Sequence, residues 1–382
     1  MAGLVKAKDY DWKDSNLALF GSDTEKQIKK ESALTEKAWE RVGKAKEPFL
    51  FVWRVKKFTL EEVKPEDVGT FYNGDSYVVC KGTKLPDKEK LLYDVHFWIG
   101  KHSTQDEYGT AAYKTVELDT YLDDAAIQHR EVEGYESERF KGYFNKLVIL
   151  KGGYASGFRH VEPEKYRPRL LRFCKEGKIT YMRQVEYTKS AVDSGDVFIL
   201  DLGATAYQFN GSKCSAFEKS SAAAFLQDLE SSRNGRCVTH VLEEKSIDKD
   251  VSPLIAVQSS VYFTKQPHEF WKALPDKPLK PEAEKVDVVK SLYKVSDASG
   301  KIQISMVCEG SAPKNSIKPD DVYMIQDKSG LFVYIGKDCS HAEKRNAFSI
   351  AHKFLQTSKN PFLPITVVTE EQAASFLAGI WD

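Results

Sequence analysis

Short runs of apolar residues that alternate with polar ones dominate the chain from Phe49 onward, and this pattern is typical of β-strands. The first such runs are Phe49–Val55, Asp75–Cys80, Tyr93–Ile99 and Leu147–Leu150. The stretch Ser103–Leu122 has a helical pattern instead, because Thr104 and Glu107 form a capping box and no proline follows within it. Strands with one long helix among them predict an α+β unit.

The predicted helix is apolar on more than one side. One side carries a set of small and apolar residues: Tyr108, Ala111, Ala112, Leu118 and Leu122. Tyr113 and Val116 lie off that side. A helix with two apolar sides either lies deep in a core or presents one side to a partner, and the pattern alone leaves both interpretations open.

The same order of elements occurs three times along the chain, and each copy has an acidic turn followed by an apolar strand. The turns are Gly74-Asp75, Gly195-Asp196 and Asp320-Asp321. A second strand then ends in a glycine, and a glutamate follows seven positions later: the pairs are Gly100 and Glu107, Gly211 and Glu218, and Gly336 and Glu343. Three ordered elements with one constant interval predict three copies of one fold.

Each repeated glutamate also closes a capping box, with Thr104, Ser215 or Ser340 three residues earlier. Proline-containing segments separate the copies at 162–168 and 275–281, and the three prolines of the second favour an extended path. The predicted division is an N-terminal extension at 1–48, repeat 1 at 49–161, repeat 2 at 162–274, a linker at 275–285 and repeat 3 at 286–382.

The N-terminal extension contains a predicted helix. Ser22 and Glu25 form a further capping box, and apolar residues follow at helical spacing: Ile28, Leu34, Ala38, Trp39 and Val42. Two interpretations are open for this helix. It either packs on the body of the protein or forms an arm that docks on a partner.

Composition and charge exclude several classes of function. The 56 basic and 56 acidic residues give no net charge, so no overall field attracts nucleic acid or membrane. No apolar run has the length of a membrane span or signal peptide, and the six cysteines are scattered, so we expect a cytoplasmic protein with reduced thiols and no transmembrane segment. No P-loop, GxSxG or HExxH motif is present, so we do not expect an enzyme.

Two local features offer binding chemistry. An Asp at each turn and a Glu at each helix start provide hard oxygen ligands of the kind that Ca²⁺ prefers, although capping and turn formation also explain these residues. Basic residues gather between Arg159 and Arg183, at the first boundary. This basic segment is either a solvated linker or a surface for anionic lipid headgroups or an acidic protein.

Several motifs resemble the gelsolin family. They are Trp53-Arg-Val55, Phe71–Tyr77, His96–Gly100, Gln105–Glu107, Gln128–Glu131 and Gly152–Phe158. With three repeats, the chain most resembles the three-domain actin-severing members of the severin and fragmin type. The resemblance implies three gelsolin-like repeats, each a mixed sheet of roughly five strands between a long and a short helix.

The resemblance also implies Ca²⁺ as the cofactor, with one site in each repeat. The first site would use the backbone of Gly74, the side chains of Asp75 and Glu107, and the backbone of Tyr154. The second would use Gly195, Asp196 and Glu218, and the third Asp320, Asp321 and Glu343. A further Ca²⁺, shared with actin, would use the side chain of Asp119 and the backbones of Asp124 and Ala126, although Asp124 stands where glycine is common in the family.

Monomeric and filamentous actin are the implied partners. The helix of repeat 1 would enter a cleft in actin, with contacts from Gln105, Asp106, Tyr113, Val116 and Phe158. The filament side and phosphatidylinositol 4,5-bisphosphate would bind the basic segment, through Arg159, Arg167, Arg169, Arg172, Lys175 and Lys178. The segment Asn145–Lys151 is apolar where relatives are rich in lysine, and Val197 and Asn210 replace a disulfide of secreted relatives.

The implied function is calcium-dependent severing of actin filaments and capping of their barbed ends, together with nucleation and inhibition by phosphoinositides, at the cytoskeleton. Three alternatives stay open at this point: capping without severing, a protein that bundles filaments or acts as a scaffold, and a phosphoinositide-binding adaptor.

Overall fold

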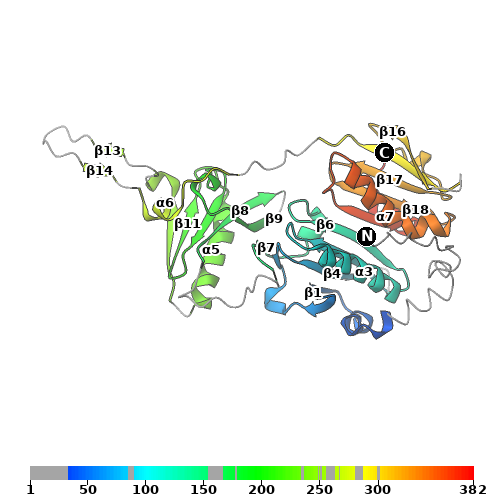
Figure 1. Cartoon of the computed structure of the whole chain (residues 1–382), viewed down its shortest axis with the longest axis horizontal. Coiled ribbons are helices and arrows are strands. Elements are labelled where there is room, and N and C mark those ends of the chain that lie inside the picture. Colours follow the sequence, from blue (N-terminus) through cyan, green and yellow to red (C-terminus); the bar gives the residue numbers. More distant parts are fainter. Residues whose placement is uncertain are drawn as a thin grey trace, which may run out of the picture.

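The computed structural model describes residues 33–84, 90–153, 167–176, 179–233, 236–247, 249, 252–254, 263–265, 267–279, 287–298 and 302–382. Repeat 1, in blue and cyan, lies between repeat 2, in green, and repeat 3, in yellow to red (Figure 1). The predicted capping box at Ser22 lies outside the described residues. None of the described helices is both long enough and apolar enough to cross a membrane.

Repeat 1 has the strands and the long helix that its sequence predicts. Its elements are β1 (Phe49–Lys56), β2 (Thr59–Glu62), β3 (Thr70–Tyr72), β4 (Ser76–Lys84), β5 (Leu91–Ile99), α3 (Gln105–Tyr121), β6 (Ala126–Val132), α4 (Glu138–Lys141) and β7 (Leu147–Leu150), with the short helix η4 at Pro65–Asp67. The capping box at Thr104 is present in the structure, and α3 starts immediately after it.

Repeat 2 and repeat 3 follow the same order. Repeat 2 consists of β8 (Arg169–Glu176), β9 (Ile179–Val185), η7 (Lys189–Ala191), β10 (Val197–Asp201), β11 (Thr205–Asn210), α5 (Ala216–Ser232), β12 (Val238–Glu243), η8 (Glu244–Ser246), β13 (Ser252–Leu254), β14 (Phe263–Lys265) and α6 (Glu269–Ala273). Repeat 3 consists of β15 (Ser291–Ser296), β16 (Gln303–Glu309), η9 (Lys314–Ser316), β17 (Val322–Asp327), β18 (Gly330–Ile335), α7 (His341–Thr357), β19 (Ile365–Thr369) and α8 (Glu370–Phe376). The helices α3, α5 and α7 each have 17 residues and a capping box, as the repeated spacing predicts.

The repeats share their sheets with one another. The order β16-β15-β17-β18-β19-β6-β5-β4-β1-β2 joins repeats 3 and 1 in one ten-stranded sheet. The order β12-β11-β10-β8-β9-β7-β3 adds two strands of repeat 1 to the sheet of repeat 2. Leu147–Leu150 is therefore a strand, as predicted, but it pairs with β9 of repeat 2 and not with the main sheet of repeat 1.

The junction between repeats 1 and 3 is an antiparallel pair of strands with a buried arginine beside it. In β6 and β19, Arg130 lies opposite Ile365, and His129 lies opposite Thr366. Arg130, of which only 2% is exposed, donates to the carbonyl oxygens of Pro361 (2.9 Å) and Leu363 (2.7 Å). Its guanidinium is also 2.7 Å from Nδ1 of His352 in α7. One side chain of repeat 1 therefore binds three groups of repeat 3.

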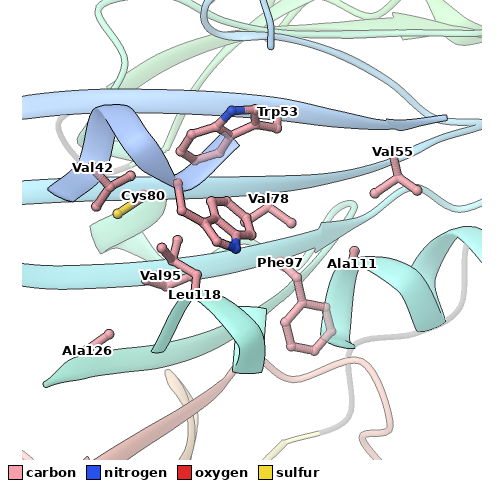
Figure 2. Packing of buried hydrophobic residues seen from close by; sticks show 11 residues of the cluster. Val42, Trp53, Val55, Val78, Cys80, Val95, Phe97, Ala111, Leu118 and Ala126 are labelled. Atoms are coloured by element: carbon pink, nitrogen blue, oxygen red, sulfur yellow. The ribbon is translucent and has the colours of Figure 1, made fainter. Parts of the chain in front are cut away.

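The N-terminal segment packs on repeat 1 from residue 33 onward. It forms η3 (Lys37–Trp39) and α2 (Glu40–Lys44). Trp39 and Val42 are fully buried, and the Trp39 ring lies edge-on against Trp53 at 5.2 Å. Trp39 Nε1 also donates to Glu117 of α3 (2.9 Å). Figure 2 shows Val42 of α2 in the same core as Trp53 and Leu118, so for this segment the first of the two interpretations is correct.

The beginning of the predicted linker is attached to repeat 2. The Thr188 hydroxyl lies 2.9 Å from the carbonyl oxygen of Pro275 and 2.7 Å from that of Lys277. The backbone N–H of Lys189 also donates to Pro275 (3.0 Å). Proline has no N–H to donate, but the carbonyl oxygen of Pro275 accepts hydrogen bonds here. The first residues of the predicted linker are therefore bound to the surface of repeat 2.

Candidate functional site

The repeated glycine lies against the acidic turn in all three repeats. The glycine N–H donates to the carbonyl of the turn Asp, and the distances are 3.0 Å for Gly100 to Asp75, 3.1 Å for Gly211 to Asp196 and 3.2 Å for Gly336 to Asp321. A Cβ at Gly100 would lie 2.5 Å from the carbonyl oxygen of Asn73 and 2.7 Å from that of Asp75. Because no side chain fits there, the position needs glycine, and this contact fixes where the capped helix begins.

We expect Gly100→Ala to lower the free energy of unfolding by about 1–3 kcal/mol, because the added methyl group overlaps two carbonyl oxygens of the turn. Gly109→Ala is the matched control in α3, where nothing lies within 4 Å of the Cβ position. We expect that change to stabilise by about 0.5–1 kcal/mol, since alanine is the better helix former. Urea unfolding followed by tryptophan fluorescence measures both variants, and equal loss in the two would contradict the packing argument.

The repeated glutamates hold the starts of the long helices. One oxygen of each accepts the N-cap N–H: Thr104 to Glu107 at 2.9 Å, Ser215 to Glu218 at 2.7 Å and Ser340 to Glu343 at 3.0 Å. In repeats 2 and 3 the other oxygen accepts a backbone N–H from the end of the first strand, at Lys175 (2.8 Å) and Asp297 (2.9 Å). The glutamates are thereby fixed next to the acidic turns, which capping alone does not require.

Each acidic-turn aspartate forms an ion pair with a cation from the first strand of its repeat. Arg54 of β1 pairs with Asp75, Arg172 of β8 pairs with Asp196, and Lys294 of β15 pairs with Asp321 at 2.5 Å. All three carboxylates are buried. Burial raises the pKa of Asp196, against the opposing effect of Arg172. Burial acts the same way on Asp321, but the hydrogen bond from Lys294 lowers its pKa on balance.

In repeat 1 the turn and the glutamate meet at a pocket of about 520 Å³. Its lining includes Gly74, Glu107, Gly152 and Gly153. A Cβ at Gly74 would lie 2.6 Å from the carbonyl oxygen of Gly152, and one at Gly153 would lie 2.9 Å from Asp75 Oδ1. The backbones of the two segments and the Asp75 carboxylate therefore lie so close together that only glycine fits at positions 74 and 153. Tyr154, the remaining expected ligand, lies outside the described residues.

The oxygen donors of this pocket fit a hard divalent cation. The Glu107 carboxylate and the backbone of Gly74, Gly152 and Gly153 line the pocket, and the buried Asp75 Oδ1 lies directly behind Gly153. Carboxylates and backbone carbonyls from separate segments are the ligand chemistry of Ca²⁺. In repeats 2 and 3, Glu218 and Glu343 are hydrogen-bonded to the end of the first strand, which pairs with the strand that follows Asp196 or Asp321. The assignment of these residues as ligands stays a prediction.

The expected ligands of the shared site lie together at the end of α3. Asp119 accepts from the Ala126 N–H (2.9 Å) and from the Gln128 side chain (2.6 Å). Burial raises the pKa of Asp119 to about 6, while these two hydrogen bonds act in the opposite direction. Asp124 has a φ of 58°, in the left-handed region that favours glycine, and Asp is one of the residues other than glycine that adopts it most readily.

The outer side of α3 is apolar and exposed. Tyr113 is 56% exposed and Val116 is 42% exposed, whereas Ala111 and Leu118 on the inner side are fully buried. The inner side of this helix therefore lies in the core, and the interpretation that the outer side binds a partner stays a prediction. Asp106 is exposed as well, and the side chain of Gln105 is outside the described residues.

An apolar pocket of about 260 Å³ lies along this outer side and is closed by repeat 3. Tyr113 and Val116 line it from α3, and Phe348 lines it from α7. The Phe348 ring also lies 5.4 Å from that of Phe97 in β5. The sheet junction therefore places α7 beside the exposed face of α3.

The equivalent helices have no large apolar residue at the positions that correspond to Tyr113 and Val116. Six and nine residues after the repeated glutamate, repeat 1 has Tyr113 and Val116, repeat 2 has Ala224 and Gln227, and repeat 3 has Ser349 and His352. Among the three long helices, only α3 therefore carries large apolar side chains at these two positions.

The basic segment is less open than its sequence suggests. Arg169 pairs with the buried Asp201 (3.1 Å), and Arg172 pairs with Asp196. Lys175 lies over the Phe217 ring at 4.7 Å, and Arg167 is exposed. Arg159, Lys178 and the expected actin contact Phe158 lie outside the described residues. An anion-binding role for this segment stays a prediction.

Among the described residues, one cluster has side chains of metal-ligand type, Asp94, His96 and His129, and it is buried in repeat 1. The two imidazole rings are stacked at 4.0 Å with an angle of 11°. His96 contacts Glu131 and Tyr143, and His129 contacts Asp94 and Thr366. Because parallel rings cannot direct their lone pairs at one ion, this cluster is a hydrogen-bond network.

Fold and site together define a modular protein of three α+β repeats, each with an acidic turn beside a capped helix. The model of the gelsolin repeat matches residues 57–141 and 179–248. Severin from Echinococcus granulosus is 71% identical over 386 residues, 100% of both chains. Gelsolin-like protein 2 from Lumbricus terrestris is 45% identical and covers 96% of this chain and 95% of its own. The chain belongs to the gelsolin family.

One solved structure is described as a Thorarchaeota 2DGel3/rabbit actin complex. It matches 60% of this chain and 100% of its own at 25% identity, with a TM-score of 0.23. That score is too low to support an inference about this chain. The family assignment therefore depends on the sequence relatives.

The sequence did not predict that Arg54, Arg172 and Lys294 pair with the acidic-turn aspartates, and Arg172 was expected to bind the filament side or phosphoinositide instead. These three strand cations lie 21, 24 and 27 residues before their aspartates, so a search for constant intervals does not find them. The available signal was a single cation between apolar residues in the first strand of each repeat: Trp53-Arg-Val55, Leu171-Arg-Phe173 and Tyr293-Lys-Val295.

Proposed function

We propose that this protein is a calcium-dependent actin-binding protein that severs actin filaments and caps their barbed ends. The observation that carries the proposal is the exposed apolar face of α3, formed by Tyr113 and Val116. It occurs in a chain that is 71% identical over its full length to a protein named severin. Exposed aromatic and aliphatic groups beside a pocket are typical of a protein-binding surface.

In this proposal α3 enters an apolar cleft of actin. Tyr113 and Val116 provide the buried contact, and Gln105, Asp106 and Phe158 bind around it. Asp119, with the backbones of Asp124 and Ala126, would hold a Ca²⁺ at the edge of that contact. Burial of α3 replaces contacts between actin subunits, so severing needs no covalent chemistry and the protein stays on the barbed end.

In this proposal, repeat 2 binds the side of the filament. Arg167 and Lys175 are exposed there and would meet acidic groups of the filament or phosphatidylinositol 4,5-bisphosphate. Competition between the two ligands would make phosphoinositides inhibitory. The protein would act in the cytoplasm, at the cytoskeleton.

Calcium control is proposed to act on the arrangement of repeats 1 and 3. When bound, Ca²⁺ supplies two positive charges to the acidic-turn carboxylates. Phe348 of α7 lies in the pocket beside α3, and Arg130 joins the two repeats, so this compact arrangement limits access to the apolar face. A shift toward separated repeats would remove Phe348 from beside that face and open it to a large partner, provided that the acidic turns hold Ca²⁺ more tightly in the separated state.

Fluorescence microscopy of immobilised actin filaments tests the proposal. We expect nanomolar protein to break filaments along their length in micromolar calcium and to leave them intact in chelator. Filaments that stop growing at one end without breaking would reduce the function to capping. Thick bundles would instead identify a bundling protein, and no effect on filaments would overturn the actin proposal.

A further inference from the structure

The three strand cations occupy the same register in their repeats. Arg54 is the cross-strand partner of Tyr77, Arg172 of Phe198, and Lys294 of Tyr323. Each partner is the second residue after the acidic-turn aspartate, so each cation reaches diagonally back to that aspartate. The cation and the aspartate therefore have the same relative position in all three repeats, although the number of residues between them differs.

The strand cations neutralise the charge of buried carboxylates. The Asp75 side chain is 0% exposed, and its Arg54 partner is 18% exposed. A buried carboxylate without a counter-charge is strongly destabilising, whereas a paired one is tolerated. Arg54 therefore supplies the positive charge at Asp75 in this arrangement of the protein.

Arg54 and Ca²⁺ would use the same carboxylate. Asp75 is expected to be a ligand of the site in repeat 1, and its Oδ2 is the oxygen that Arg54 holds. When Asp75 binds a divalent cation, it either exchanges Arg54 for the ion or keeps two positive groups within a few ångströms of each other. Both events oppose binding, because like charges repel strongly where solvent is excluded.

We propose that Arg54, Arg172 and Lys294 are built-in competitors of Ca²⁺, which raise the calcium concentration that each site requires. This inference rests on the proposed calcium function and adds residues that set its threshold. Each cation keeps its carboxylate neutralised until calcium is high enough to replace it. The sites then stay unoccupied at low calcium without being unstable.

The three pairs differ in burial, and this predicts an order. The cation side chain is 18% exposed in Arg54, 40% in Arg172 and 35% in Lys294. Water screens the more exposed pairs, so their competition with Ca²⁺ is weaker. Removing the charge of Arg54 therefore has the largest effect.

The test measures calcium binding to purified full-length protein by isothermal titration calorimetry, without actin. The background variant carries Glu218→Gln and Glu343→Gln, which remove a carboxylate from the sites of repeats 2 and 3 but retain the capping boxes, since glutamine also caps. In this background we expect Arg54→Gln to tighten binding at the repeat 1 site at least about tenfold. Without calcium we expect a lower melting temperature than in the background protein, and in calcium a large part of that loss is recovered.

Two further variants control for charge and folding. Lys56→Gln removes a positive charge from the same strand, where Lys56 pairs with Glu61 instead, and we expect unchanged calcium affinity. Arg54→Lys keeps the charge, and we expect an affinity within about threefold of the background. If Arg54→Gln does not fold, Lys294→Gln in a background of Glu107→Gln and Glu218→Gln makes the same test at the more exposed pair.

The outcomes separate this inference from the proposed function. Unchanged or weaker calcium binding in Arg54→Gln would overturn the competitor role while leaving calcium control in place. Equal tightening in Lys56→Gln would also overturn it, because the effect would then be one of general charge. If the unmodified protein binds no calcium in the same titration, the proposed calcium function fails, and the inference fails with it.

Discussion

Tyr113→Asp is expected to weaken actin binding at least about 100-fold while the protein stays folded. Tyr113 is 56% exposed, so a charged side chain there meets water in the free protein and costs little stability. In the proposed complex the same charge is buried against an apolar cleft. Loss of a central aromatic contact costs about 2–4 kcal/mol at an interface, and burying an unpaired charge adds to it.

The equivalent helix of repeat 3 supplies a matched control. Ser349 occupies the position of Tyr113, six residues after the repeated glutamate, and it is exposed in α7. Ser349→Asp therefore adds the same charge at the same place in the repeat but outside the apolar face. Fluorescence titration of labelled actin monomers in calcium compares the two variants. Equal affinity for Tyr113→Asp and Ser349→Asp would show that α3 is not the actin-binding helix.

The repeat architecture was predictable because its signals are local. The capping boxes at Thr104, Ser215 and Ser340 fix the helix starts, and the constant interval from each glycine follows from a hydrogen bond to the acidic turn. Short-range steric and hydrogen-bond constraints of this kind leave a trace in spacing. The exposed positions of Tyr113 and Val116 were also visible, as apolar residues off the main helical stripe.

The relations between repeats were not predictable, because they depend on which strand edges meet. Leu147–Leu150 has the pattern of a strand, but nothing in it indicates that its partner is β9 of repeat 2. Arg130 follows a buried histidine in an ordinary strand, and its three partners in repeat 3 lie more than 200 residues away. The pairing of the strand cations with their aspartates was not predictable for a similar reason, since segments of different length separate the two residues in each repeat.

Arg130→Met is expected to lower the calcium concentration at which filaments are severed. The substitution removes the donor for the carbonyl oxygens of Pro361 and Leu363, and unsatisfied buried acceptors cost about 1–3 kcal/mol each. The cost falls on the paired arrangement of repeats 1 and 3, because these carbonyls regain water when the repeats separate. A loss of about 3 kcal/mol corresponds to a roughly 100-fold larger population of separated molecules.

His352 shows that the junction needs Arg130 in particular. Burial and the neighbouring Arg130 charge lower the pKa of His352, so the ring is neutral and its Nδ1 accepts from the guanidinium. Methionine fills similar space but donates nothing to any of the three partners. Stability measurements alone would not identify a junction effect, since any buried substitution destabilises. Calcium dependence of severing is the readout that a purely structural role would leave unchanged.

Arg233→Met distinguishes an effect on the junction from general loss of stability. Arg233 binds the buried Asp201 within repeat 2 and has no part in the junction. We expect it to lower the melting temperature and to leave the calcium requirement for severing unaltered. Arg130→Met is expected to shift the calcium midpoint downward by tenfold or more. If both variants need as much calcium as the unmodified protein, separation of repeats 1 and 3 does not limit activity, and control must act through the acidic turns alone.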